Sequence, residues 1–306
     1  MTTEAPSIEF GVSPIAWIND DMPELGADTP LDHVLRDIAE LGFTGVELGG
    51  RFPKTPAELK ALLGGFNLKL VGGWYSAELL TRTAEAEIAL LQGHLDLLKA
   101  MGSQVFIIAE TSNAIHGQKS TALKTRPHLA AADWVQYGRR LTDVADYIVG
   151  QGLKFAYHHH LGTVVEDEAD LNAFIANTGE TVGLTLDTGH AVLGGIDPFA
   201  VIAAAPGRIN HVHCKDIRRD VFARTAGDHD SFLNGVLEGM FTVPGDGEID
   251  YGRLMRDLKR IDYSGWIIVE AEQDPAKADP RAYADIGLKT LKREAAAAGL
   301  IETAAA

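Results

Sequence analysis

The sequence contains a single cysteine, Cys214, which excludes a fold held together by disulfide bonds. It also argues against a structural zinc site, because such sites are built from clustered thiolates. No apolar run approaches the ~20 residues that a membrane-spanning helix requires. Residues 1–10 carry neither a basic segment nor an apolar one, so we expect no secretory signal, no membrane partner and a cytoplasmic location.

Basic residues are also few. Lys and Arg number 27 against 43 Asp and Glu, which makes the formal net charge −16 at pH 7. Nucleic acids and anionic membrane surfaces both attract basic patches, so this charge argues against either as a partner. The content of 46% apolar and 23% charged residues is typical of an ordinary globular protein.

Short apolar runs and helical patterns alternate along the whole chain, and no Ser-, Gly- or Pro-rich linker divides it. Strands are predicted at 8–14, 45–48, 69–74, 104–109, 153–158, 182–187, 209–214 and 266–271. Helices are predicted between and after them, at 31–41, 56–63, 84–101, 130–151, 168–177, 198–204, 250–261 and 282–298. Strands that alternate with helices form parallel βαβ units, and eight such units close a barrel.

The first strand is not followed by the glycine-rich phosphate turn that is typical of an open, doubly wound sheet. We therefore predict an α/β fold with a single (β/α)8 barrel domain, a TIM barrel, over residues 1–306. An extended loop over 216–249 follows the seventh strand. Loops of this length often act as lids or contact other subunits, so a homo-oligomer is compatible with the sequence, which does not determine the oligomeric state.

Polar side chains stand at the ends of five predicted strands: Glu47, His158, Asp187, His213 and Glu270. Because side chains alternate between the two faces of a strand, each of these points away from its bulky apolar neighbours. The C-terminal ends of barrel strands meet at one rim, which carries the active site. The five polar groups are therefore expected to converge.

Unpaired carboxylates packed together repel one another and are costly to desolvate, and a divalent cation removes that penalty. Mixed carboxylate and imidazole ligands suit Mn²⁺, Co²⁺, Fe²⁺ or Zn²⁺ better than Ca²⁺. The alternative is a water-filled polar rim with salt-bridged carboxylates and no metal. A non-catalytic sugar-binding barrel is disfavoured by the number of converging polar strand ends, and an endonuclease on a related barrel by the negative charge.

Several motifs resemble those of the xylose-isomerase-like TIM barrels, the sugar isomerase/epimerase superfamily. They are FTGVE (43–47), LDTGH (186–190), HVHCKD (211–216), VPGDGEID (243–250) and GWIIVE (265–270). Within that superfamily the chain is most similar to the inosose dehydratases, through segments 11–17, 157–163 and 269–275. The resemblance implies a metal-dependent lyase of inositol catabolism. Its substrate would be a cyclitol ketone, scyllo-inosose (2-keto-myo-inositol), and its product a trihydroxycyclohexane dione. The alternative is a sugar or keto-sugar isomerase or epimerase on the same fold.

The resemblance also implies the ligands of a metal ion, Mn²⁺ or Co²⁺. The superfamily uses Glu, Asp, His and Glu from strands five to eight, and the last three correspond to Asp187, His213 and Glu270. Strand five ends here in a triple histidine instead of a glutamate. The fourth ligand is therefore not determined. His158 is the first choice, His160 is the second, and Glu166 is held in reserve. The missing glutamate also counts against an epimerase mechanism in which two ligand glutamates exchange protons.

Loss of water beside a ketone requires a polarised carbonyl, a base for the α-proton and an acid for the departing hydroxyl. The candidates for these proton transfers are His190, Lys215, Glu47 and His160. A hydrogen-bonded turn histidine and a salt-bridged lysine are the alternative interpretations of His190 and Lys215, and base and acid are not assigned among the four. Glutathione has been linked to the dehydratases as a cofactor, but no motif in this chain would bind it. Trp17 and Trp74, after strands one and three, are candidates for apolar walls around a substrate ring or for ordinary packing.

Overall fold

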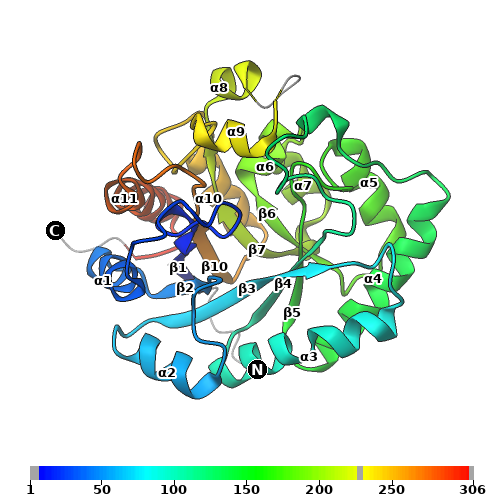
Figure 1. Ribbon diagram of the computed structural model, residues 1–306, viewed down its shortest axis with the longest axis horizontal. Coiled ribbons are helices and arrows are strands. Elements are labelled where there is room, and N and C mark those ends of the chain that lie inside the picture. The colour runs from blue at the N-terminus through cyan, green and yellow to red at the C-terminus, as the bar shows by residue number, and fades with distance from the viewer. Residues whose placement is uncertain (1–6, 226–229, 303–306) are drawn as a thin grey trace.

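The computed structural model describes residues 7–225 and 230–302 and contains a closed barrel of eight parallel strands with helices around it (Figure 1). The barrel strands are β1 (Ile8–Val12), β2 (Gly45–Leu48), β3 (Lys69–Ala77), β4 (Val105–Glu110), β5 (Lys154–His158), β6 (Gly183–Asp187), β7 (Ile209–Cys214) and β10 (Gly265–Val269). Each strand pairs with its neighbours in chain order, and β10 pairs with β1 to close the ring. The predicted (β/α)8 barrel is confirmed.

The helices that follow the strands are α1 (Leu31–Leu41), α2 (Pro56–Gly64), α3 (Ala84–Met101), α4 (Asp133–Gly150), α5 (Glu168–Asn177), α7 (Pro198–Ala204), α10 (Tyr251–Arg260) and α11 (Pro280–Ala298). Local sequence explains several of their ends. The Thr83 side chain accepts the Ala86 amide at the start of α3, and Gly102 ends that helix with a left-handed φ of 75°. A further short helix, α6 (Thr188–Leu193), follows β6 directly, where the sequence predicted only a turn.

Two apolar regions confirm the predicted alternation of faces. Phe155, Leu184 and Ile267 belong to the large core between strands and helices. A separate small cluster contains residues that point into the barrel: Val71, Val105, Ile107, Ala156, Trp266 and Ile268. A Cβ on Gly45 would lie 2.6 Å from the Trp266 ring, so glycine is required for that ring to fit. Because Trp266 and Ile268 precede Glu270 on the same face of β10, this cluster forms a floor beneath the polar rim.

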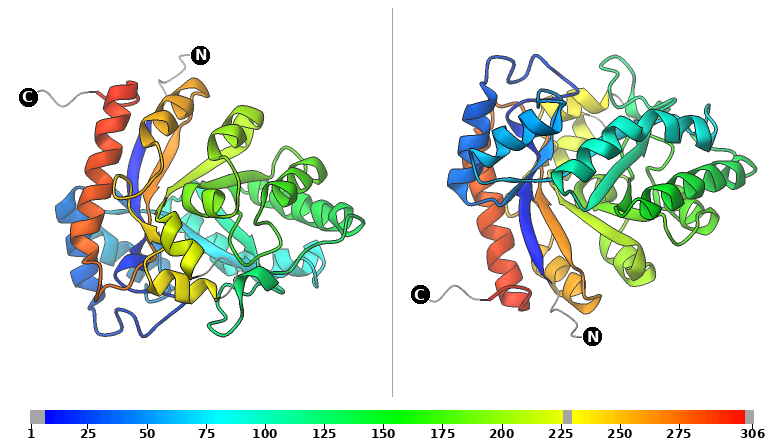
Figure 2. Two further views of the ribbon diagram at one scale, coloured as in Figure 1. Left: turned by 90° about the horizontal axis from the view of Figure 1, so that it is seen from above. Right: turned by 90° about the horizontal axis from the view of Figure 1, so that it is seen from below.

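The segment predicted as an extended loop contains short elements of its own. These are β8 (Asp216–Ile217), α8 (Arg219–Arg224), α9 (Phe232–Leu237) and β9 (Phe241–Thr242). Strands β8 and β9 form a two-stranded antiparallel sheet, and residues 226–229 lie outside the described part of the chain. Figure 2 shows this segment, in yellow, at the barrel end opposite the start of β1.

Phe232 and Phe241 of this segment pack near His190, with ring centroids 5.8 and 5.1 Å from the imidazole. The segment therefore covers part of the rim that carries the polar strand ends. Among the described residues, no helix combines the length and apolar character needed to cross a membrane.

Candidate metal centre

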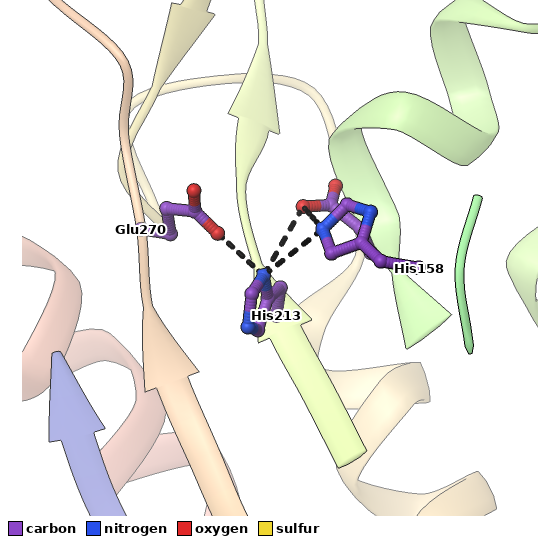
Figure 3. A group of neighbouring side chains, drawn as sticks. His158, His213 and Glu270 are labelled. Atoms are coloured by element: carbon purple, nitrogen blue, oxygen red, sulfur yellow. Dashed lines mark hydrogen bonds and ion pairs between the residues drawn. The ribbon is translucent and has the colours of Figure 1, made fainter. Parts of the chain in front are cut away.

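Four of the predicted polar side chains meet at the rim of the barrel. His158 ends β5, Asp187 ends β6, His213 lies on β7 and Glu270 follows β10, and one ligand atom from each lies within 4.8 Å of the others. The Nδ1 atom of His213 is 3.3 Å from His158 Nε2, 3.7 Å from Asp187 Oδ2 and 2.5 Å from Glu270 Oε2. Figure 3 shows His213 between His158 and Glu270. All four side chains are buried.

In His158 and Asp187, the polar side-chain atom that does not face the cluster forms a hydrogen bond outside it. His158 Nδ1 donates to the His159 carbonyl at 2.8 Å, which leaves a lone pair on the Nε2 atom that faces the cluster. Asp187 Oδ1 accepts the His190 amide in the first turn of α6. Asp187 Oδ2 and Glu270 Oε2 belong to buried side chains and face His213 Nδ1, at 3.7 and 2.5 Å. Buried carboxylate oxygens are costly unless a cation faces them, so this set of oxygen and imidazole donors fits a divalent metal ion, which would take the place of the His213 proton.

Opposite charges dominate the electrostatics of the cluster. Burial lowers the pKa of His213, but the Glu47 and Glu270 carboxylates outweigh burial and hold that pKa well above its ordinary value of 6.5. Burial raises the pKa of Asp187, but Lys215 and His190 outweigh it and hold the pKa well below the usual range. Without a cation, the cluster is therefore an imidazolium ion between carboxylates.

Metal binding should consequently release a proton and tighten as pH rises. Metal ligands must be deprotonated, and the raised pKa keeps His213 protonated in the metal-free protein above pH 6.5. We expect the affinity for Mn²⁺ or Co²⁺ to rise as the pH rises above 6.5, by up to about tenfold per pH unit where His213 is still protonated in the metal-free protein. Calorimetry in two buffers of different ionisation enthalpy measures the released proton. An affinity independent of pH over this range would contradict the expectation.

A second group of possible ligands adjoins the first and consists of His160, His190 and Glu272. This group already contains a cation, because Lys215 Nζ lies 2.6 Å from Glu272 Oε1 and 3.1 Å from His190 Nε2. Burial lowers the pKa of Lys215, but the carboxylates of Glu270, Glu272 and Asp187 raise it above its ordinary value. Lys215 is therefore an ammonium ion, and the sequence-based option that it acts as a base is not supported. Its shortest ion pair is with Glu272, and Glu270 and Asp187 lie 3.4 and 3.8 Å from the same nitrogen.

A cavity of about 250 Å³ opens onto these groups. His160 and Glu47 line it, together with Trp74 and three of the four cluster residues. His190 and Lys215 are 1% and 0% exposed and do not occur among the described residues that line the cavity. The four candidates for proton transfer therefore divide into two that face the cavity and two that lie behind its wall.

His160 is a cavity residue with an unprotonated ring nitrogen. Its Nδ1 donates to the Leu161 carbonyl at 2.7 Å, which leaves the lone pair on Nε2. Burial and the neighbouring His190 hold the pKa of His160 well below 6.5, so the ring is neutral near pH 7. The two imidazoles lie with centroids 3.7 Å apart.

The cavity is also lined by residues that were not among the predicted site residues, and Glu272, Asp21 and His116 are three of them. Glu272 lies two residues beyond Glu270, so strand alternation is the signal that could have placed it on the same side. Asp21 comes from the loop after β1, where burial and the Glu272 charge raise its pKa to about 7. His116 comes from the loop after β4, and its Nδ1 is buried with no partner among the described residues. No periodic pattern could place these two loop residues.

Two sequence-based candidates point elsewhere. Glu166, the reserve ligand, accepts the Gly162 amide at 2.6 Å and pairs with Arg126 at 3.2 Å, outside the described metal-ligand groups. Trp17 is buried, its indole donates to Asp37 at 3.1 Å, and it is not one of the described cavity residues. Trp74 does line the cavity.

Arg126 also pairs with Asp167 and Asp170, at 2.6 and 2.8 Å, and its side chain is only 5% exposed. We expect Arg126→Met to lower the free energy of unfolding by about 3 kcal/mol, because it removes a buried counter-charge that three partly buried carboxylates share. Urea denaturation measures the loss. Arg224→Met, at an exposed pair, is the control and should cost no more than about 0.5 kcal/mol. Equal effects of the two substitutions would contradict the expectation.

Comparisons with known proteins agree with the barrel fold described above. A family model described as "Xylose isomerase-like TIM barrel" matches residues 35–294. The rhizopine catabolism protein MocC of Rhizobium meliloti is 44% identical over 96% of this chain and 90% of its own length. An inosose dehydratase of Lacticaseibacillus casei is 40% identical over 91% of this chain and 94% of its own.

Solved structures support the same fold. A xylose isomerase domain protein from Alicyclobacillus acidocaldarius superposes with a TM-score of 0.67 and 18% identity, over 96% of this chain and 100% of its own. The resemblance found in the sequence motifs is thereby confirmed. The chain belongs to the xylose isomerase-like TIM barrel family.

Proposed function

We propose that the protein is a metal-dependent inosose dehydratase, a hydro-lyase that removes water from scyllo-inosose to give a trihydroxycyclohexane dione in inositol catabolism. The observation that carries the proposal is a four-ligand cluster that opens into a cavity beside a neutral histidine, His160. The identity to inosose dehydratases over nearly the whole chain supports the substrate class. We propose Mn²⁺ or Co²⁺ as the ion.

When bound by His158, Asp187, His213 and Glu270, a divalent cation would polarise the ketone oxygen of the substrate and acidify the adjacent C–H bond. His160 faces the cavity with a free Nε2 lone pair and would accept the α-proton.

The departing hydroxyl would take its proton from Lys215 by way of Glu272. The Glu272 carboxylate faces the cavity and accepts a hydrogen bond from Lys215 Nζ at 2.6 Å, so it would receive a proton from the ammonium ion and pass it to the hydroxyl. One proton leaves carbon and one reaches oxygen, which balances the loss of water. His190 lies next to both His160 and Lys215 and would return the proton from the first to the second.

The ligand set also distinguishes this proposal from an epimerase. An epimerase of the kind considered above moves protons between two ligand glutamates. The cluster described here holds one glutamate, Glu270, and β5 supplies His158 in place of the second. This difference favours elimination of water over inversion at carbon.

The test is an assay with scyllo-inosose after thorough chelation, with and without added Mn²⁺ or Co²⁺. We expect ultraviolet absorption of a new dione only when metal is added. A product that differs from the substrate only in stereochemistry would support the isomerase or epimerase alternative. Full activity in the chelated protein would exclude the metal from the reaction.

A further inference from the structure

Glu47 lies on the side of His213 that faces away from the cluster. Its Oε1 atom accepts from His213 Nε2 at 3.0 Å and from His211 Nε2 at 2.8 Å. All three side chains are buried. Strand β2, which carries Glu47, is separated from β7 by β1 and β10 in the barrel, so this contact crosses the barrel interior.

This arrangement determines which nitrogen of His213 carries the proton. A carboxylate accepts hydrogen bonds, and one oxygen of Glu47 lies within hydrogen-bond distance of both Nε2 atoms. Both Nε2 atoms therefore donate to it. As a metal ligand His213 is neutral and has a single N–H hydrogen, so its lone pair is then on Nδ1. Nδ1 is the atom that lies 3.3 Å from His158 Nε2 and 2.5 Å from Glu270 Oε2.

We propose that Glu47 is a positioning residue of the metal centre, which holds His213 in the ring orientation and tautomer that present Nδ1 to the cation. His211 is the second donor to the same oxygen and keeps the carboxylate from rotating away. The assignment replaces the proton-transfer role that the sequence suggested for Glu47. The inference rests on the metal centre of the proposed function. It adds to the four ligands a residue that contacts a ligand side chain and does not itself bind the metal.

At His158 the opposite tautomer is set by a different contact, because its Nδ1 hydrogen goes to a backbone carbonyl. A backbone acceptor cannot be removed by substitution, whereas a carboxylate can. Partners of this kind orient the ligand, and their loss typically weakens metal binding ~10- to 100-fold. Glu47 is therefore the position at which the orientation of a ligand histidine can be tested directly.

The experiment measures Co²⁺ affinity of metal-free Glu47→Ala and Glu47→Gln by competition with a chelating indicator, and kcat at saturating Co²⁺. We expect Glu47→Ala to weaken Co²⁺ binding ~10- to 100-fold while kcat at saturation stays within about tenfold of the parent value. The Gln amide oxygen can still accept from one imidazole, so Glu47→Gln should show a smaller loss of affinity. Glu110→Gln, a buried glutamate at the end of β4 outside the described metal-ligand groups, is the matched control for affinity.

Unchanged Co²⁺ affinity together with a kcat reduced by ~10² or more would overturn the inference and restore a proton-transfer role. If circular dichroism shows that Glu47→Ala does not fold, the Co²⁺ affinity and kcat of Glu47→Gln are compared with those of the parent protein instead. The affinity measurement needs no substrate. A protein that binds Co²⁺ more weakly after substitution but leaves inosose unchanged would support the inference and refute the dehydratase proposal. If the parent protein binds no Co²⁺, the inference fails.

Discussion

Asp187→Asn and Glu270→Gln should each abolish turnover and metal binding together. Each substitution keeps the size of the side chain but removes a negative charge and one of the two buried carboxylate oxygens that face His213 Nδ1. We expect the metal dissociation constant to rise at least ~100-fold and kcat/KM to fall by ~10³ or more, because the cation supplies several kcal/mol of barrier lowering. Metal content by elemental analysis and the dione assay measure the two effects on the same preparations.

The matched control is Glu110→Gln. Glu110 is also a buried glutamate at the end of a barrel strand, but its oxygens accept the Leu79 and Ser112 amides. A Gln side chain keeps the size of Glu110 and one of its accepting oxygens, and Glu110 lies outside the described metal-ligand groups. This variant should keep its metal and its activity. If Asp187→Asn and Glu270→Gln kept a full complement of metal, the four-ligand cluster would be the wrong site.

His160→Gln should reduce turnover without releasing the metal. The substitution removes the cavity-facing Nε2 lone pair, and loss of a general base typically costs ~10²- to 10⁴-fold in kcat. Metal affinity should stay within about threefold of the parent value, since His160 is not one of the four cluster residues. Steady-state kinetics at saturating Mn²⁺ and a metal titration separate the two quantities.

His159→Phe provides the control for that prediction. His159 is adjacent in sequence and equally buried, but it does not occur among the described cavity residues, and both its ring nitrogens lack a partner there. Replacing this ring by an apolar one should leave kcat unchanged. A loss of metal in His160→Gln would instead indicate that His160 is a ligand, which was the second choice for strand five.

The dehydratase proposal and the metal proposal depend on different evidence. Identity over nearly the whole chain supports the substrate class, whereas the metal rests on atoms that this structure brings together.

Much of the site followed from the strand pattern. The period of two along a strand placed His158, Asp187, His213 and Glu270 on the inner face, and the barrel brings them within 4.8 Å of one another. The same pattern placed Lys215 inward. It did not reveal that Lys215 is covered by Glu272 and His190, or that three carboxylates keep it charged.

The order of strands and helices and the alternation of polar and apolar residues, both local properties of the chain, were sufficient to establish the barrel and the face on which its polar residues lie. Three features came only from the tertiary structure. Glu47 pairs with His213 across the barrel. Asp21 and His116 line the cavity, and Glu166 pairs with Arg126 and lies outside the described metal-ligand groups. The physical reason is that a hydrogen bond between strands that are not neighbours, or from an irregular loop, depends on how the whole ring closes. The periodic patterns in the sequence do not predict contacts that depend on this closure.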